Sequence, residues 1–121
     1  MQKIFITGGG GYVGSALADY LVSKGYTVTA YDLFLYGEKV FSSKSNLKTI
    51  KGDIRNLDLL KSSIAGQDAV IHLAAKVSIR NSINTLKEDL NINLVGTINV
   101  LRASSKFKIK KFIFASSMAV Y

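Results

Sequence analysis

Four consecutive glycines at residues 8–11 constrain the fold of this chain more than any other feature of its sequence. They follow a short apolar run at residues 3–7, which is typical of a buried strand. Beyond them, apolar residues recur at helical spacing from Val13 to Leu21, and Gly25 is a natural end for a helix. The sequence therefore predicts a strand, a tight glycine turn and a helix in direct succession.

The rest of the chain continues this alternation. Short apolar runs predict four more strands, at residues 27–31, 47–51, 69–73 and 111–116. Two more helices are predicted, over residues 57–64 and 85–105, and the polar residues 36–46 are interpreted as a loop. One face of the longer helix carries Leu90, Leu94, Thr97, Ile98 and Leu101. Strands alternating with helices indicate an α/β fold in one domain, residues 1–121: a doubly wound, Rossmann-like parallel sheet of about five strands in the order 3-2-1-4-5.

Composition excludes several classes of protein. With 121 residues, 48% of them hydrophobic, the chain can bury the core of one domain. No apolar run approaches the roughly 20 residues that cross a bilayer, and no signal peptide is evident, so we expect no membrane partner and a cytoplasmic location. Cysteine is absent and His72 is the single histidine, so no metal site is expected.

The net charge of +8 is compatible with an anionic ligand. The lysines are scattered, however, and the one dense run, at residues 106–111, reads as a solvated turn between a helix and a strand. We therefore expect no nucleic acid partner.

The glycine turn suits the binding of a dinucleotide. Two registers fit it, Gly9-x-Gly11-x-x-Gly14 and Thr7-Gly8-x-x-Gly11-x-x-Gly14. Glycine tolerates positive φ in a tight turn and lets a diphosphate approach the backbone. The helix that follows offers unpaired N–H groups and a partial positive charge to the phosphates. A flexible loop with no ligand is the alternative interpretation.

Asp32 closes the second predicted strand, 18 residues after Gly14. A carboxylate there can accept hydrogen bonds from the adenosine ribose hydroxyls and would repel a 2′-phosphate, so NAD is favoured over NADP. Neither Leu33 nor Phe34 supplies a basic group for a 2′-phosphate. A solvated strand-end carboxylate is the alternative.

Five ordered motifs make the chain resemble the extended short-chain dehydrogenase/reductase family, in its nucleotide-sugar epimerase and dehydratase branch. They read TGGGGYVG at residues 7–14, GDIR at 52–55, HLAA at 72–75, NLVGT at 93–97 and FIFASSMAVY at 112–121. The resemblance implies NAD as cofactor. It implies cofactor contacts at Gly8, Gly11, Tyr12, Val13, Gly14, Asp32, Asp53, Ile54, Leu73, Ala74, Ala75 and Lys76.

The resemblance also gives some of these residues separate roles. Asp53 accepts from the adenine amino group and Ile54 packs on the ring, whereas residues 73–75 run beside the diphosphate and ribose. Lys76 lies near the position where some 4-epimerases place a lysine close to the nicotinamide ribose. A simple turn or cap role for Asp53 is the alternative.

The same resemblance implies two catalytic residues. Ser117 bonds the hydroxyl or ketone oxygen of the substrate, and Asn93 holds a water in the proton path. The alternatives are a serine that simply ends a strand and a solvated asparagine on a helix. The general base of the family is a tyrosine in a Y-x-x-x-K pair beyond that serine, and Tyr121 is not its counterpart. The one literal match, Tyr20 with Lys24, lies on the first helix, where Val13, Ala16, Leu17, Tyr20 and Leu21 are expected to form the buried stripe. His72 is interpreted as a hydrogen-bonded strand-end residue without a chemical role.

The sequence thus predicts the NAD-binding portion of a nucleotide-sugar epimerase, catalytically incomplete without the tyrosine, the lysine and a substrate domain. An NDP-sugar substrate is expected only for a full-length protein. Two alternatives stay open: a stand-alone NAD-binding or self-associating module without catalysis, and a fragment of a 4,6-dehydratase. Residues 116–118, Ser-Ser-Met, favour the epimerase, because similar dehydratases carry Thr-Asp-Glu near this point. The edge at the last strand is expected to promote self-association.

Overall fold

The fold is a five-stranded parallel sheet with helices on both faces. A computed structural model describes residues 2–35, 45–75 and 86–115. The strands are β1 (Lys3–Thr7), β2 (Thr27–Asp32), β3 (Leu47–Lys51), β4 (Ala69–His72) and β5 (Lys111–Phe114). Their order is β3-β2-β1-β4-β5, and every neighbouring pair is parallel, as predicted from the sequence.

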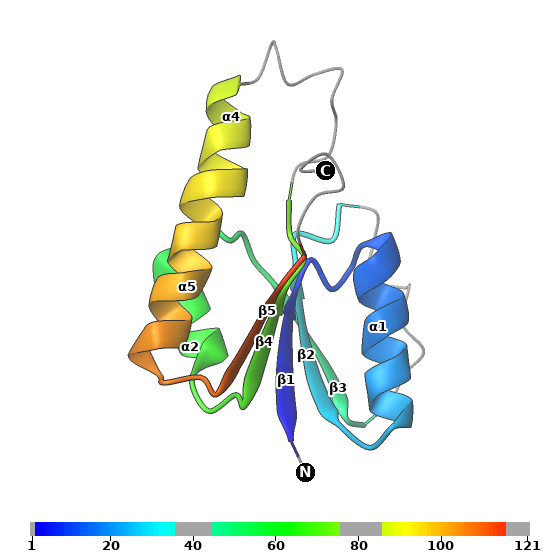
Figure 1. Ribbon diagram of the computed structural model, residues 1–121. Helices are drawn as coiled ribbons and strands as arrows, with labels where there is room; N and C mark the ends of the chain where they lie inside the picture. The colour runs from blue at the N-terminus through cyan, green and yellow to red at the C-terminus, as the bar shows by residue number, and fades with distance from the viewer. Residues whose placement is uncertain (1, 36–44, 76–85, 116–121) are drawn as a thin grey trace.

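Helices cover the two faces unequally. The helix α1 (Tyr12–Ser23) lies on one face, whereas α2 (Leu57–Ile64) and α5 (Gly96–Lys106) lie on the other (Figure 1). The single long helix predicted over residues 85–105 is three joined segments: α4 (Leu86–Leu90), a π-helix (Asn91–Val95) and α5. In Figure 1 these segments form one rod, and α4 projects beyond the carboxyl ends of the strands.

The sheet separates two hydrophobic clusters. Side chains alternate across β1, so Phe5 packs toward α2 and α5 while Ile4 and Ile6 pack toward α1. This two-sided burial explains why the first strand reads as a continuous apolar run. The cluster under α2 and α5 contains Phe5, Tyr31, Ile54, Leu60, Ile64, Val70, Val100 and Ala103. The cluster under α1 contains Ile4, Ile6, Ala18, Val22, Val28 and Ile71.

The prediction of which face of α1 is buried was wrong. The helix buries Gly14, Ala18 and Val22, with Leu17 and Leu21 half-buried beside them. Tyr20 is 57% exposed, and Val13 and Ala16 are exposed too. The reason is steric, because a Cβ on Gly14 would overlap the carbonyl group of Gly8. Gly14 must therefore face the sheet, and the positions four and eight residues later follow it.

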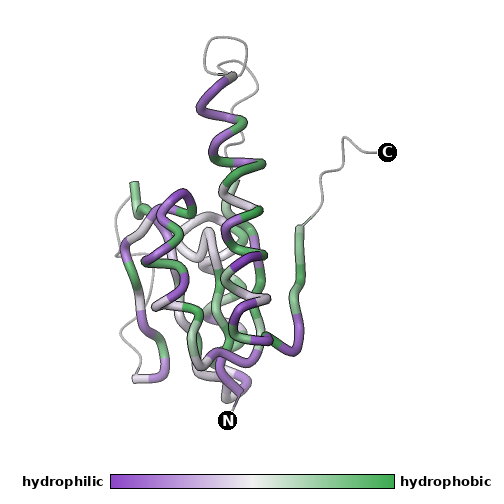
Figure 2. The backbone as a smooth tube through the Cα atoms, turned by 90° about the vertical axis from the view of Figure 1, so that its left-hand side faces the viewer, coloured by the Kyte–Doolittle hydropathy of each residue, from purple (hydrophilic) through white to green (hydrophobic). Residues whose placement is uncertain are grey.

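The long helical rod does not pack its apolar stripe against the sheet. Gly96, Asn99, Val100, Ala103 and Ser104 are buried on α5. The residues predicted to share a face divide: the hydroxyl of Thr97 reaches the sheet, whereas Leu90, Leu94, Ile98 and Leu101 are about half exposed. Figure 2 shows the hydrophobic positions alternating with hydrophilic ones along this rod.

Candidate cofactor site

The four glycines form a tight turn at the carboxyl end of β1. The amides of Gly8 and Gly9 donate to the carbonyl of Tyr31 on β2, at 2.9 and 3.3 Å, and Gly11 N donates to the carbonyl of Gly8 at 3.1 Å. Gly8 adopts a φ of 73°, which disfavours any residue with a side chain. The turn therefore holds its backbone close against two strands.

Close contacts fix most of the glycines, including two that the family motif leaves variable. A Cβ on Gly8 would lie 2.8 Å from Ala74 N, and one on Gly9 would lie 2.6 Å from the Cβ of Ala30. A Cβ on Gly10 would meet the ring of Phe34 at 2.8 Å. The site residues predicted from the sequence omitted Gly9 and Gly10, although the other dinucleotide register contains Gly9.

The N-terminus of α1 is free of side-chain capping. Gly11 is the N-cap and carries no capping group, and the first turn holds no acidic residue. Tyr12, which opens the helix, is 95% exposed. By contrast, Asn56 caps α2 by accepting from Leu59 N at 3.1 Å. The amides at the start of α1 thus fit a diphosphate, since no capping side chain and no acidic residue of the first turn competes for their N–H groups.

Asp32 lies against this turn from the end of β2. Its Oδ2 accepts from Gly10 N at 3.0 Å, and its Oδ1 accepts from Phe34 N at 2.7 Å. Phe34 has a φ of 54° and is buried, so the chain bends sharply after the carboxylate. Each carboxylate oxygen has a further lone pair, which suits the hydroxyls of a ribose.

The segment after β3 carries the residues predicted to meet adenine. Asp53 forms a bidentate pair with Arg55, whose Nη2 lies 2.6 Å from Oδ2. The hydrogen bonds from Arg55 hold the pKa of the Asp53 carboxyl below its usual range. Tyr31 donates its hydroxyl to the carbonyl of Asp53 at 2.7 Å, and burial, helped by the Asp53 charge, raises the pKa of Tyr31 to about 12.

Ile54 belongs to the hydrophobic core. Its side chain is 5% exposed and touches Gly96, where any Cβ would overlap it. Asn99 on α5 donates its Nδ2 to the carbonyls of Ile54 and Arg55, at 3.1 and 3.3 Å. The helix α5 therefore holds this segment in place, and little of the Ile54 side chain is exposed for packing against an adenine ring.

The end of β4 lies on the other side of the glycine turn. Thr7 Oγ1 accepts from the amides of Leu73 and Ala74, at 3.1 and 3.2 Å. Leu73 and Ala74 are half-buried and Ala75 is exposed. The glycine turn, Asp32 and residues 73–75 thus meet at the carboxyl ends of β1, β2 and β4. This is the point where the chain passes from one side of β1 to the other, and ligands bind there in doubly wound sheets.

His72 is buried beneath this meeting point, with 2% of its surface exposed. Its Nδ1 lies 2.6 Å from Thr7 Oγ1, and its Nε2 lies 2.8 Å from Thr97 Oγ1. Burial lowers the pKa of His72 to about 4. Both ring nitrogens are engaged, in agreement with the interpretation of His72 as a hydrogen-bonded strand-end residue.

The predicted catalytic residues are only partly described. Asn93 is exposed in the π-helix, and its carbonyl accepts the Thr97 hydroxyl at 2.7 Å. Ser117 and Lys76 lie outside the described residues. The single Y-x-x-x-K match, Tyr20 with Lys24, lies at the far end of α1, with Lys24 Nζ 5.5 Å from the Tyr20 ring. It is about two turns of helix away from the glycine turn.

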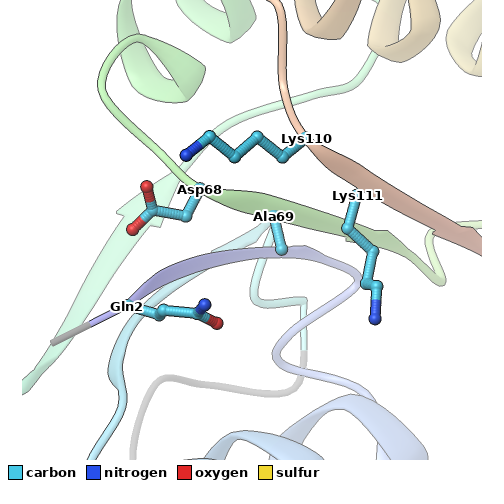
Figure 3. A pocket seen from close by; sticks show the side chains of 5 residues that line it. All are labelled: Gln2, Asp68, Ala69, Lys110 and Lys111. Carbon is cyan, nitrogen blue, oxygen red and sulfur yellow. The ribbon is translucent and has the colours of Figure 1, made fainter.

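A hollow lies at the opposite end of the sheet, where β1, β4 and β5 begin. Gln2, Asp68, Ala69, Lys110 and Lys111 line it (Figure 3). Oδ2 of Asp68 accepts from Lys3 N at 2.7 Å, so the carboxylate serves the backbone there. Within the described ranges, no helix is long and apolar enough to cross a membrane. The same part of the chain brings no three His, Cys, Asp or Glu side chains together as metal ligands.

A parallel sheet in this order, with a glycine turn and a strand-end carboxylate where the order reverses, defines a Rossmann-type dinucleotide-binding fold. Residues 4–121 match the family model described as the NAD dependent epimerase/dehydratase family, and the chain belongs to that family. NAD is the cofactor of this family, as the sequence predicts.

Curated relatives and solved structures agree with this assignment. The chain is 36% identical over 132 residues to the bifunctional UDP-glucose 4-epimerase and UDP-xylose 4-epimerase 1 of Pisum sativum, covering 99% of this chain and 38% of that protein. An epimerase structure from Methanothermobacter thermautotrophicus matches 97% of this chain and 35% of its own, with a TM-score of 0.91 and 31% identity. The Bordetella bronchiseptica enzyme WbmH in complex with NAD⁺ matches 93% of this chain and 38% of its own, with a TM-score of 0.81 and 33% identity.

The relatives include dTDP-glucose 4,6-dehydratases as well as epimerases. The chain spans well under half the length of these curated relatives, from 30% to 39%.

Proposed function

We propose that this chain is the NAD-binding portion of a nucleotide-sugar epimerase. The observation that carries the proposal is the contact between Gly10 N and the Asp32 carboxylate, which unites the diphosphate turn with a ribose-binding group. NAD bound at this site would supply reversible hydride transfer at C4 of the sugar. The pea relative, which is named for two UDP-sugar epimerase activities, supports the choice of reaction.

The residues of this chain bind and orient in that scheme. The backbone of the glycine turn and the start of α1 hold the diphosphate, and Asp32 accepts from the adenosine ribose. Residues 73–75 border the diphosphate and the ribose next to it, because Gly8 lies against Ala74. By resemblance, Ser117 donates to the sugar oxygen and Asn93 holds the water of the proton path.

Asp53 can bind adenine only if its carboxylate accepts a further hydrogen bond or exchanges one that it already has. Arg55 already donates to both oxygens of that carboxylate, from its backbone amide and its guanidinium. An adenine amino group must therefore use a remaining lone pair or displace Arg55, whose side chain is 41% exposed and has room to move.

Calorimetric titration with NAD, and with NADP in parallel, tests the cofactor assignment. We expect NAD to bind and NADP to bind more weakly, because Asp32 repels a 2′-phosphate. Asp32→Ala should weaken NAD about 10-fold or more, since it removes a charged acceptor. Asp58→Ala, which removes an exposed carboxylate from the first turn of α2, is the matched control and should leave the affinity unchanged. Equal NAD binding by both variants would reject the role of Asp32.

Assays with a UDP-sugar test the catalytic part. We expect a polypeptide of these 121 residues to bind NAD without turnover, because its one Y-x-x-x-K pair lies far from the glycine turn. Turnover by the purified polypeptide would contradict this. Epimerisation, rather than loss of water, by a longer protein containing this chain would separate the epimerase from the dehydratase.

Self-association through the edge at β5 is part of the same proposal. Among the described residues, β5 pairs with β4 alone, and Ile113 and Phe114 are about half exposed on it. A second copy of the chain would cover both the open edge and these side chains. Light scattering at increasing concentration should show a mass above 13.2 kDa, and Phe114→Lys should reduce it. A strict monomer at high concentration would contradict the proposal.

A further inference from the structure

Three side chains form a chain of hydrogen bonds beneath the cofactor site. The ring of His72 lies between the hydroxyls of Thr7, on β1, and Thr97, on α5. Thr7 and Thr97 are 90 positions apart in the sequence, so His72 joins two distant elements. Beyond the two threonines, the chain of bonds reaches Leu73 and Ala74 on one side and Asn93 on the other.

The direction of every bond in this chain follows from counting donors and acceptors. The Thr97 hydroxyl donates its single proton to the carbonyl of Asn93, so its oxygen accepts from His72 Nε2–H. Thr7 Oγ1 accepts from the amide of Ala74 and from that of Leu73, which it shares with the Thr7 carbonyl, so its own proton is available to His72 Nδ1. The Thr97 end thus requires the neutral tautomer with the proton on Nε2, and the Thr7 end agrees with it.

One end of this chain of bonds lies at the proposed cofactor site, and the other is the turn that carries Asn93, to which the resemblance gives a place in the proton path. Leu73 and Ala74 touch Gly8, where no Cβ could fit, so a shift of their backbone must move the glycine turn. At the other end, Thr97 bonds the carbonyl of Asn93 four residues before it, within the π-helix. Such a bond from a threonine to the preceding turn bends a helix, and π-turns recur at functional sites.

We propose that His72 is a positioning residue that holds residues 73–74, beside the glycine turn, and the Asn93 turn in one fixed register. It acts through Thr7 and Thr97 and touches neither cofactor nor substrate. The functional consequence, which is the placement of the diphosphate relative to Asn93, rests on the proposed function. Its geometry stands on the hydrogen bonds alone.

Nitrogen-15 NMR of the full chain without a histidine tag reads this arrangement directly, because His72 is the single histidine. We expect a protonated Nε2 and an unprotonated Nδ1 at neutral pH. A spectrum of the wild type with the proton on Nδ1 would overturn the proposal before any variant is made.

Thr97→Val tests the coupling, because valine keeps the shape and removes the acceptor. We expect the ring-nitrogen shifts to move, and the amide signals of Gly8, Leu73 and Ala74 to move with them. NAD should bind about 3- to 10-fold more weakly, the effect of one buried hydrogen bond. Thr97→Ser keeps the hydroxyl and should restore both the shifts and the affinity to within about twofold.

Thr29→Val is the matched control. Thr29 is a buried threonine on β2 that accepts from Gln67 Nε2 at 3.1 Å, away from His72. It should leave the ring nitrogens and the three amides unchanged. If Thr97→Val does not fold, His72→Gln, which keeps a donor toward Thr97, should perturb the Gly8, Leu73 and Ala74 amides more than that of Asn93.

Each result decides one of the two claims. Unchanged amides in Thr97→Val would overturn the positioning role, as would moved amides with unchanged NAD affinity. If the wild type binds no NAD, the proposed function fails, while the amide shifts still decide whether His72 couples the two segments.

Discussion

Gly14 faces the carbonyl group of Gly8 so closely that a Cβ at position 14 would overlap it. This single approach sets the rotation of α1 about its axis and its distance from the glycine turn. It links the first strand, the turn and the first helix into one rigid unit, and the candidate diphosphate site is the surface of that unit.

Gly14→Ala should therefore destabilise the protein strongly. The obstacle is backbone that α1 and β1 both hold, so it cannot yield as a flexible side chain would. We expect a loss of at least about 3 kcal/mol in the free energy of unfolding, measured with urea. Gly11→Ala is the matched control, because its Cβ would lie 3.4 Å from Gly8 O, and it should cost about 1 kcal/mol or less. Similar losses in the two variants would contradict this explanation.

The protein should lose stability in acid through His72. Its pKa is about 4 when folded, against 6.5 for a free side chain, so the unfolded chain binds the extra proton between these values. The contribution is complete above about pH 6.5 and is lost as the pH falls toward 4, a change of about 3 kcal/mol. Urea unfolding of the wild type and of His72→Gln at pH 7, 5.5 and 4.5 isolates it. Parallel curves for the two proteins would disprove the assignment.

The Asp53–Arg55 pair should contribute little at neutral pH. Both side chains are partly exposed, at 25% and 41%, so we expect Arg55→Gln to cost about 1 kcal/mol or less. Because Arg55 lowers the pKa of Asp53, the stabilisation is present above about pH 4, the unfolded value, and disappears as the pH falls through the folded value. A carboxyl titration followed by NMR should find the Asp53 pKa higher in Arg55→Gln, and an unchanged pKa would count against the pair.

Asn99 should matter more than this ion pair, although it carries no charge. It is buried and donates to two backbone carbonyls after β3, those of Ile54 and Arg55. Asn99→Leu leaves these acceptors unpaired and should cost about 2 kcal/mol or more. Ser104→Ala is the control, because that hydroxyl bonds the carbonyl of Val100 within its own helix, and its loss should cost under about 1 kcal/mol. Thermal unfolding of the two variants compares them, and equal midpoints would refute the ranking.

The strands and their order could be predicted from the sequence because the period of the apolar residues reports burial directly. The glycine turn and Asp32 could be found for a related reason, since a tight turn admits few residue types. The phase of α1 could not, because the contact at Gly14 outweighs the apolar pattern that placed Tyr20 in the core. The π-helix also escaped prediction, because Leu90, Leu94 and Ile98 recur at the spacing of an ordinary α-helix.

The positioning role of His72 could not be predicted from the sequence for a different reason. Its partners, Thr7 and Thr97, lie 65 and 25 positions away, and threonine is common in both strands and helices. Only the paired strands β1 and β4 and the packing of α5 bring the three side chains together. The one available signal was that the chain has a single histidine, placed at the end of a buried strand.

The central position of β1 has a consequence for synthesis on the ribosome. Its partner β2 is complete at Asp32, but its other partner, β4, begins only at Ala69. At about 5–20 residues per second, the nascent chain spends a few seconds with one side of its first strand unpaired. During that interval the backbone N–H and C=O groups on one edge of residues 4–6 are open to strands of other nascent chains, so crowded polysomes are where misassembly of this protein should begin.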